Sequence, residues 1–274
     1  MSNEDGTIER RAVLRGGLAS AVALGAAACT TAPAPVPSAT PPATGTVGGV
    51  APAATPSRGP TATGTADSRP LALRTAGDDI AHGPRTKPLA CLTFHGAGDP
   101  GLTDQALRVC RDHGARITVF AVGTWLAAHP ELGRAIVAGG HDLGNHTWSH
   151  QPMLGLSAAA AESEIRRGAA AVAAIQGSNP LLFRPSGTAH STPLLQEAAR
   201  TAGYFRCISY DIDPMDYLDP GSATVTRRTL GAVRAGSIVS LHLGHRGTVD
   251  ALPDILAGLH ERGLTPGTVS EVLA

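Results

Sequence analysis

His146 and His150 are the residues of this sequence whose type and spacing most directly suggest chemistry. Imidazole nitrogens are common ligands of zinc and of other transition metals. Side chains four residues apart meet on one side of a helical turn, so a turn at 146–150 would direct both rings at one ion. Histidine pairs at this spacing also occur on surfaces and in cores without a metal. The pair therefore predicts part of a metal site that other residues must complete.

A second set of polar residues follows the ends of apolar runs. Each member comes directly after a segment that we expect to be a buried strand. The set comprises His95, His146, Arg184, Asp213 with Asp216, and His242. In β/α barrels the active-site groups lie where strands end and loops begin, at one end of the barrel. The positions of these residues therefore predict an enzyme with its site at that end.

Short apolar runs alternate with amphipathic runs over the last two thirds of the chain. Strands are expected at 89–94, at 117–122, before His146, and at 181–183, 206–210 and 237–241. Helices are expected at 102–110, 131–138, 157–175, 192–202, 223–233 and 249–261. This alternation is typical of a parallel sheet covered by helices. About seven such units favour an α/β fold of the (β/α) barrel type over an open sheet.

The charge balance argues against a nucleic-acid partner. The 274 residues include 22 Lys plus Arg and 22 Asp plus Glu, and no basic run stands out beyond the N-terminal region. Proteins that bind nucleic acids usually carry a basic patch or stripe. The length suits one catalytic domain, and the composition leaves the oligomeric state open.

Residues 1–29 are expected to be an export signal. Arg10 and Arg11 precede an uncharged stretch of small residues at 16–28, which is too short to span a membrane. The paired arginines resemble a twin-arginine signal. The residues before Cys29 are similar to the cleavage box of bacterial lipoproteins, without its usual leucine. We expect export to the cell envelope, either with a lipid on Cys29 as membrane anchor or with plain cleavage and secretion.

Residues 30–86 are expected to form a disordered linker, followed by a catalytic domain at 87–274. Up to about residue 70 the linker is nearly all Thr, Ala, Pro, Gly, Ser and Val, which cannot bury enough apolar surface to fold. Within the domain, Cys91, Cys110 and Cys207 lie in apolar stretches. Cysteine in such stretches behaves as a small hydrophobic residue. We expect three buried thiols, with a Cys91–Cys110 bridge as the alternative.

The run GHDLGNHTWSH at 140–150 resembles the second motif of the polysaccharide deacetylases, the NodB-homology family also called carbohydrate esterase family 4. Four later segments resemble this family in the same order. They are FRPSG at 183–187, DPMDY at 213–217, IVSLH at 238–242, and 248–259 with 268–273 as closing helix and last strand. The first of these is one residue short, Tyr217 replaces the usual tryptophan, and Ser240 replaces a leucine. The resemblance covers about 88–273.

The resemblance implies a role for each matched residue. These are His146 and His150 as metal ligands, His242 as the acid that protonates the leaving group, Asp216 as its partner, Arg184 as a group that orients its neighbours, and Asp213 at the same opening. The implied reaction is metal-dependent hydrolysis of acetyl groups from an N-acetylated cell-wall or related polysaccharide. The implied cofactor is a divalent metal ion, with zinc as the expected identity.

The first motif departs from the family pattern. The family reads Thr-Phe-Asp-Asp-Gly, in which one aspartate is the general base and the other a metal ligand, whereas Thr93–Ala97 reads Thr-Phe-His-Gly-Ala. His95 could be the third ligand of a three-histidine zinc site. It could instead replace the base, with Asp99 turned toward the metal. In the third alternative the ion is bound weakly or not at all.

These alternatives leave two rival functions. One is a glycan-binding barrel that has lost catalysis, and the other is an amidase that acts on a different carbon–nitrogen bond. We expect a hydrolase that acts on non-peptide carbon–nitrogen bonds.

Overall fold

The computed structural model describes residues 70–274. The predicted export signal at 1–29 and residues 30–69 of the predicted linker lie outside the described residues. The strands are β1 (Leu89–Gly96), β2 (Thr118–Ala121), β3 (Asp142–Asn145), β4 (Ile238–His242) and β5 (Thr265–Pro266). They are parallel, in the order β3-β2-β1-β4, and β5 pairs with the first residues of β1. Buried apolar side chains on both faces of these strands are typical of a parallel sheet covered by helices.

Two predicted strands lie between β3 and β4 and close the barrel, but they form irregular segments and not regular strands. The segments around 181–183 and 206–212 pair through isolated bridges such as Asn145↔Phe183 and Ile212↔Val239, and through single backbone hydrogen bonds such as that from Ile208 N to Phe183 O of 2.8 Å. Pro185, which has no N–H to donate, stops the first of these segments from pairing further. The predicted (β/α) barrel is therefore confirmed, with regular strands on one side and short bridges on the other.

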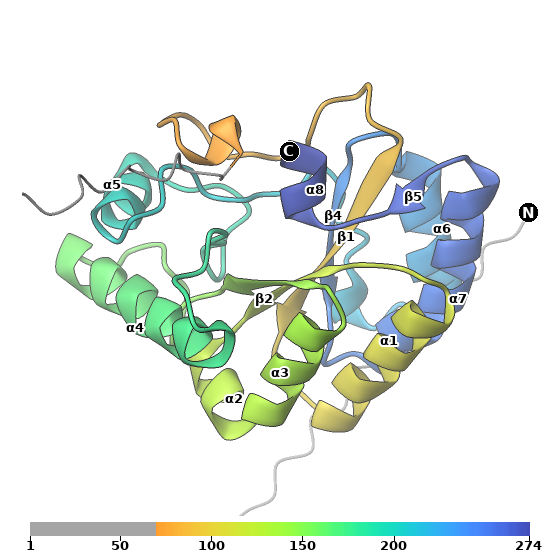
Figure 1. Ribbon diagram of the computed structural model, residues 1–274, viewed down its shortest axis with the longest axis horizontal. Coiled ribbons are helices and arrows are strands. Elements are labelled where there is room, and N and C mark those ends of the chain that lie inside the picture. Colours follow the sequence, from red (N-terminus) through yellow and green to blue (C-terminus); the bar gives the residue numbers. More distant parts are fainter. Residues whose placement is uncertain (1–69) are drawn as a thin grey trace, which may run out of the picture. The chain divides into compact units, whose positions relative to one another are not determined.

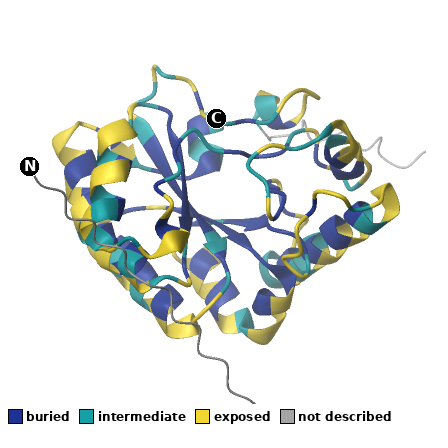
Figure 2. Ribbon diagram, turned by 180° about the vertical axis from the view of Figure 1, so that it is seen from behind, coloured by how far each residue is buried: buried dark blue, intermediate teal, exposed yellow. Residues whose placement is uncertain are grey.

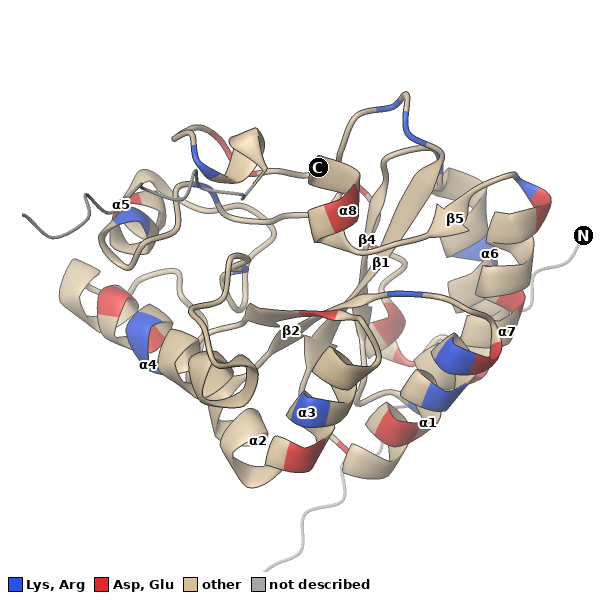
Figure 3. Ribbon diagram, viewed as in Figure 1, with Lys and Arg blue, Asp and Glu red and all other residues tan. Residues whose placement is uncertain are grey.

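Helices cover the outside of the barrel (Figure 1). They are α1 (Pro100–Asp112), α2 (Gly123–Ala128), α3 (Pro130–Ala138), α4 (Ala158–Gln176), α5 (Pro193–Thr201), α6 (Ser222–Ala232), α7 (Arg246–Glu261) and α8 (Val269–Leu273). Figure 2 shows the strands buried at the centre and the exposed residues on the outer faces of the helices. Acidic and basic residues are interspersed on these outer faces (Figure 3), as the balanced composition predicts. Within residues 70–274, the helices are too short or too polar to cross a membrane.

The predicted last strand at 268–273 is wrong, because this segment forms helix α8. Thr268 accepts a hydrogen bond from Glu271 N, and the Glu271 carboxylate accepts one from Thr268 N. This reciprocal capping box begins a helix and satisfies two backbone donors that would otherwise lack partners. The only regular strand in this region of the described chain is the two-residue β5.

The folded part of the chain extends upstream of residue 87. Leu73 and Ile80 are buried in one cluster with Val269 and Val272 of α8. Ile80 also bridges Ile208, so this segment covers one end of the barrel. Residues 70–86 therefore contribute to the core, although their composition resembles the start of the linker.

The three cysteines of the domain are free and buried, so the alternative Cys91–Cys110 bridge is not formed. Burial raises the pKa of the Cys110 and Cys207 thiols to about 12. Cys91 Sγ donates a hydrogen bond to Thr268 O. These thiols therefore act as core groups, as predicted, and are protonated at neutral pH.

Candidate metal and catalytic site

His95 and His242 lie side by side at the carboxyl ends of β1 and β4. The register of this strand pair sets His95 opposite His242 and Thr93 opposite Ser240. The centroids of the two imidazole rings are 4.3 Å apart. Because side chains two residues apart share a face of a strand, all four side chains lie on the same face. Val239 and Leu241 alternate with Ser240 and His242 along β4, so they point to the other face, and both belong to the hydrophobic core cluster.

His146 and His150 lie in a loop, so the predicted helical turn at 146–150 is wrong. Thr147 has φ 67° and His150 has φ 60°, both in the left-handed region that a right-handed helix excludes. These two positions turn the chain so that the two rings nevertheless face one another, with centroids 5.0 Å apart. The four-residue spacing therefore brings the rings together through a strained loop and not through a helix.

The side chains of His95, His146 and His150 form a group that could hold a metal ion. One nitrogen from each ring lies within 4.8 Å of the others. The Nε2 atoms of His95 and His146 are buried and have no hydrogen-bond partner. His146 Nδ1 lies 2.8 Å from Arg184 O, which can only accept, so Nδ1 carries the proton and Nε2 keeps its lone pair. Two buried nitrogens without partners are the arrangement expected of metal ligands.

The surroundings of this group keep the rings neutral. Burial, followed by the neighbouring His146, lowers the pKa of His95. Burial, followed by His150, lowers the pKa of His146. Burial also lowers the pKa of His150. A neutral imidazole is the form that donates a lone pair to a metal, so all three rings suit this purpose at neutral pH.

Helix α4 holds the loop that carries His146 and His150. The Glu164 carboxylate is buried and accepts hydrogen bonds from Trp148 N at 3.2 Å, Ser149 N at 2.9 Å and Ser149 Oγ at 3.1 Å. One turn later, a Cβ on Gly168 would lie 2.7 Å from Thr147 O. Helix α4 therefore holds the loop in place by hydrogen bonds to the Glu164 carboxylate and packs closely against it at Gly168.

Replacing Glu164 by alanine is expected to weaken the binding of a divalent ion by about tenfold to a hundredfold, because groups that orient ligands have effects of this size. The loss of three hydrogen bonds to a charged acceptor releases the two left-handed residues that aim the rings. Titration of the purified protein with zinc and a competing chelator measures the effect. Glu162→Ala is the matched control, since Glu162 pairs with Arg166 on α4 and makes no contact to the histidine loop among the described residues. Equal affinities in the two variants would show that the loop holds its shape without Glu164.

His242 is held by a buried carboxylate. Its Nδ1 lies 2.8 Å from Asp216 Oδ1, and its backbone N–H donates to Asp216 Oδ2 at 2.7 Å. Thr248 Oγ1 donates to the same Oδ2 at 2.6 Å. Since the carboxylate accepts, Nδ1 carries the proton and Nε2 remains available to the pocket. This is the arrangement of an imidazole positioned for proton transfer.

Arg184 is brought near the histidines but makes no ion pair among the described residues. Its guanidinium is fully buried and donates to Thr93 Oγ1, Ile208 O and Ser209 O. It also stacks over the Phe120 ring at 4.3 Å. Burial lowers its pKa to about 9. Arg184 therefore joins β1 to the irregular side of the barrel and supports His146 through its backbone carbonyl.

The remaining sequence candidates occupy different places. Asp213 lines the opening beside His242, and its Oδ1 accepts from Met215 N. Asp99 caps α1 through hydrogen bonds from Gly101 N and Leu102 N, and it is not part of the group that could hold a metal. The structure therefore gives no support to the alternative in which Asp99 turns toward the ion. His245, which lies near His242, pairs with the exposed Asp219.

An open pocket of about 370 Å³ adjoins the histidines. It is lined by His95, His150, Gly187, Thr188, Ala189, Tyr210, Asp213, Tyr217, Ser240 and His242. Sequence reasoning named neither Glu164 nor Tyr210 as a site residue. Tyr210 is the last residue of the strand expected at 206–210, so the rule that selected the other polar residues would have found it had it included the final strand residue. No such signal was available for Glu164, because it lies within a helix.

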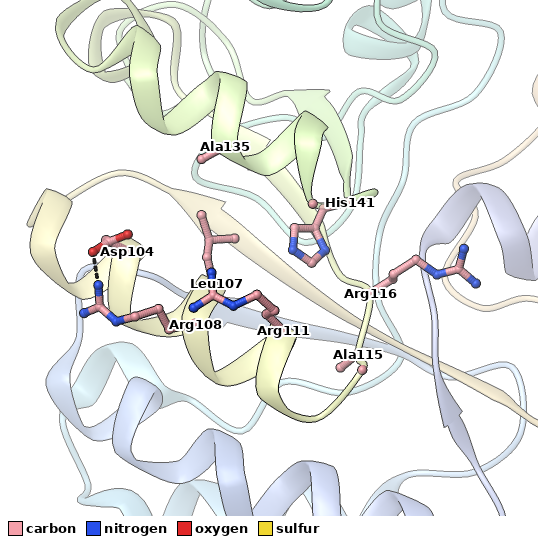
Figure 4. A pocket seen from close by; sticks show the side chains of 10 residues that line it. Asp104, Leu107, Arg108, Arg111, Ala115, Arg116, Ala135 and His141 are labelled. Carbon is pink, nitrogen blue, oxygen red and sulfur yellow. Dashed lines mark hydrogen bonds and ion pairs between the residues drawn. The ribbon is translucent and has the colours of Figure 1, made fainter.

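A second hollow lies at the opposite end of the barrel, before β2 and β3 (Figure 4). Its charged side chains are already paired, Arg108 with Asp104 and Arg116 with Glu271. His141 is buried there, and its Nδ1 accepts a hydrogen bond from Ile117 N. This hollow therefore serves the packing of the barrel end.

Comparison with known proteins identifies relatives of this chain. A family model described as polysaccharide deacetylase matches residues 82–205. A peptidoglycan-N-acetylglucosamine deacetylase of Bacillus cereus is 32% identical over 194 residues, which cover 69% of this chain and 90% of the relative. A chitooligosaccharide deacetylase of Rhizobium leguminosarum bv. trifolii is 32% identical over 184 residues, which cover 67% of this chain and 81% of the relative.

Solved structures give the same picture. A family 4 carbohydrate esterase from Streptomyces lividans, in complex with acetate, superposes with a TM-score of 0.61 at 30% identity, covering 65% of this chain and 91% of that one. A pseudoenzyme of the same family from Bacillus anthracis superposes with a TM-score of 0.67 at 22% identity, covering 72% of this chain and 69% of that one, and shows the shared fold alone. The chain therefore belongs to the polysaccharide deacetylase family, carbohydrate esterase family 4, and is a hydrolase of carbon–nitrogen bonds of the polysaccharide deacetylase type.

Proposed function

We propose that this protein removes acetyl groups from the amino sugars of a cell-wall or related polysaccharide, using a zinc ion bound by His95, His146 and His150. The observation that carries the proposal is the group of three imidazole nitrogens within 4.8 Å of one another, two of them buried and without partners. Three histidines are a common ligand set for catalytic zinc and leave one position open for water or substrate. When bound, the ion would polarise the amide carbonyl and lower the pKa of water.

The substrate class follows from the relatives. Those described above are named for deacetylation of peptidoglycan N-acetylglucosamine and of chitooligosaccharides. Both substrates carry N-acetylated amino sugars. We infer that this chain acts on a polymer of the same class, and that the pocket beside the three histidines receives its acyl group.

His242 is the group that transfers the proton. Its Nδ1–H is fixed on Asp216, so Nε2 can take up a proton and then give it to the departing nitrogen at the pocket. Asp216 keeps this tautomer and stabilises the ring when it is charged. Arg184 and Thr93 hold the strand below His95 and do not enter the reaction.

His95 is proposed as the third ligand and not as a general base. Its Nε2 is buried against His146, and no carboxylate within residues 70–274 accepts or donates a hydrogen bond there that would raise its basicity. His95→Ala is expected to lower the zinc content of the purified protein well below one ion per chain and to abolish acetate release. Elemental analysis and an acetate assay measure the two effects, with the exposed His260→Ala as control. Full zinc content without turnover would instead assign the base role to His95, and no change in either quantity would remove it from the site.

A glycan-binding barrel without catalysis remains a second candidate, because Thr93–Ala97 contains neither family carboxylate. It predicts that the zinc-treated protein binds a chitooligosaccharide and releases no acetate. An amidase on another carbon–nitrogen bond predicts product only from non-sugar amides. Assay of the same preparation on both substrate classes, alongside a binding measurement, separates the three functions.

We also propose that residues 1–29 export the protein through a twin-arginine signal and that Cys29 is acylated. Arg10→Lys together with Arg11→Lys is expected to leave the precursor in the cytoplasm. Cys29→Ser is expected to move the protein from the membrane fraction to the soluble extracellular fraction, because a lipid provides the anchor. Fractionation and immunoblotting measure both effects. An unchanged distribution of Cys29→Ser would favour cleavage and secretion without a lipid.

A further inference from the structure

Ser240 lies on the inner face of β4, one residue pair below His242. The register sets Ser240 opposite Thr93, while His242 is opposite His95 on the adjoining strand. Ser240 and His242 are two residues apart, so both side chains face the interior of the barrel. The side chain of Ser240 therefore lies directly beneath the imidazoles that form the site.

Ser240 is the deepest residue of the pocket beside these imidazoles. It is 1% exposed, whereas the other lining residues are half-buried or exposed. Rim residues such as Tyr217 and His150 are exposed. An acyl group that projects from a sugar nitrogen is small enough to enter a pocket of about 370 Å³. The tail of the acyl group is the part that meets Ser240.

The hydroxyl of Ser240 makes no hydrogen bond within the described part of the chain, and its oxygen is not among the fully buried polar atoms without a partner, so it faces the space of the pocket. Its strand neighbour Thr93 differs, since Thr93 Oγ1 donates to Val239 O and accepts from Arg184. The hydroxyl of Tyr210, which lines the same pocket, also lacks a partner among the described residues. A methyl group packed against these hydroxyls would displace water from them without forming a hydrogen bond in its place, which is unfavourable. An acyl tail with its own hydroxyl would satisfy them.

We propose that Ser240 selects an acyl group that carries a hydroxyl, and that the preferred substrate is an N-hydroxyacetyl amino sugar in place of an N-acetyl one. This inference rests on the proposed function and specifies its substrate. In the reaction, water adds its oxygen to the acyl carbon and the carbon–nitrogen bond breaks. The nitrogen keeps the electron pair of that bond and takes a proton, so the products are hydroxyacetate and a free amino sugar.

The test compares two matched chitooligosaccharides, one N-acetylated and one N-hydroxyacetylated, with the zinc-loaded full-length protein. We expect kcat/KM to favour the hydroxyacetyl substrate by about tenfold, the size of effect that follows when a buried hydroxyl is left unpaired. Ser240→Ala is expected to abolish this preference, and Ser240→Leu to reverse it in favour of acetyl. Ser178→Ala, at an exposed serine after α4, is the control. If Ser240→Leu fails to fold, Ser240→Ala decides, because it adds no volume.

The proposal fails if the wild-type protein prefers acetyl, or if its preference is independent of residue 240. A lack of turnover on both substrates would contradict the proposed function and leave the acyl pocket to be tested by binding. In that case calorimetry with hydroxyacetate and acetate replaces the assay. Tighter binding of hydroxyacetate that is lost in Ser240→Ala supports the assignment, and equal binding of the two anions overturns it.

Discussion

His146→Ala is expected to remove the metal ion and to lower the rate of deacetylation by at least about a thousandfold. His146 joins the other two histidines, with ring centroids 4.4 Å from His95 and 5.0 Å from His150. Its loss leaves His95 and His150 as two ligands, without the ring that lies between them. A catalytic metal supplies several kcal/mol of transition-state stabilisation, and about 1.4 kcal/mol corresponds to tenfold in rate. Elemental analysis and an acetate assay of the same sample measure both effects.

Thermal unfolding separates loss of the ion from loss of the fold. An ion that binds only the folded state raises its stability, so a chelator is expected to lower the Tm of the wild-type protein. The same chelator should leave the Tm of His146→Ala unchanged, because that variant has no ion to lose. The exposed His260→Ala should behave like the wild type. A chelator response that persists in His146→Ala would locate the ion elsewhere in the protein.

Most helices and the regular strands could be predicted from the sequence because their signals are local. Apolar periodicity predicted α4 and α7, and the buried runs predicted β1 and β4 within a few residues. The strand around Phe183 could be placed but not its irregular pairing, which depends on the partner segments at Asn145 and Ile208. The last segment was assigned to a strand through the family resemblance. Its own residues, Thr268 followed by Glu271, are a capping box and predict the helix that is observed.

The sequence predicted which residues form the candidate site, but not the loop and helix contacts that bring them together. The rule that polar residues after strands meet at one end of a barrel selected His95, His146 and His242, and their rings do lie together. The helical turn predicted at His150 was wrong, because a spacing of four residues does not distinguish a helical turn from a loop with two left-handed residues. Glu164 could not be found, because its partners are 15 and 16 residues away and become neighbours only when α4 packs on the loop.

Asp216→Asn is expected to lower kcat by at least about a hundredfold while the zinc content stays at one ion per chain. The Asp216 carboxylate accepts hydrogen bonds from the His242 ring, the His242 backbone and Thr248. An asparagine amide has the same shape but presents N–H donors toward at least one of these donors. The ring of His242 would then adopt another tautomer or turn away from the pocket, and a positioned acid contributes about a hundredfold or more to the rate. Single-turnover kinetics and elemental analysis measure the two quantities.

The pair of Asp219 and His245 provides a control with the same chemistry on the surface. Their separation is also 2.8 Å, but Asp219 is exposed, so Asp219→Asn should leave kcat close to that of the wild type. If Asp216 acts only through His242, then Asp216→Asn should cost little more once His242 has already been replaced by alanine, because groups that act as a unit are not additive. Additive losses would mean that Asp216 supports the site in another way, for example by fixing η2 (Asp216–Leu218) and the loop around it. The double variant therefore distinguishes an imidazole held for proton transfer from a carboxylate that only stabilises the barrel end.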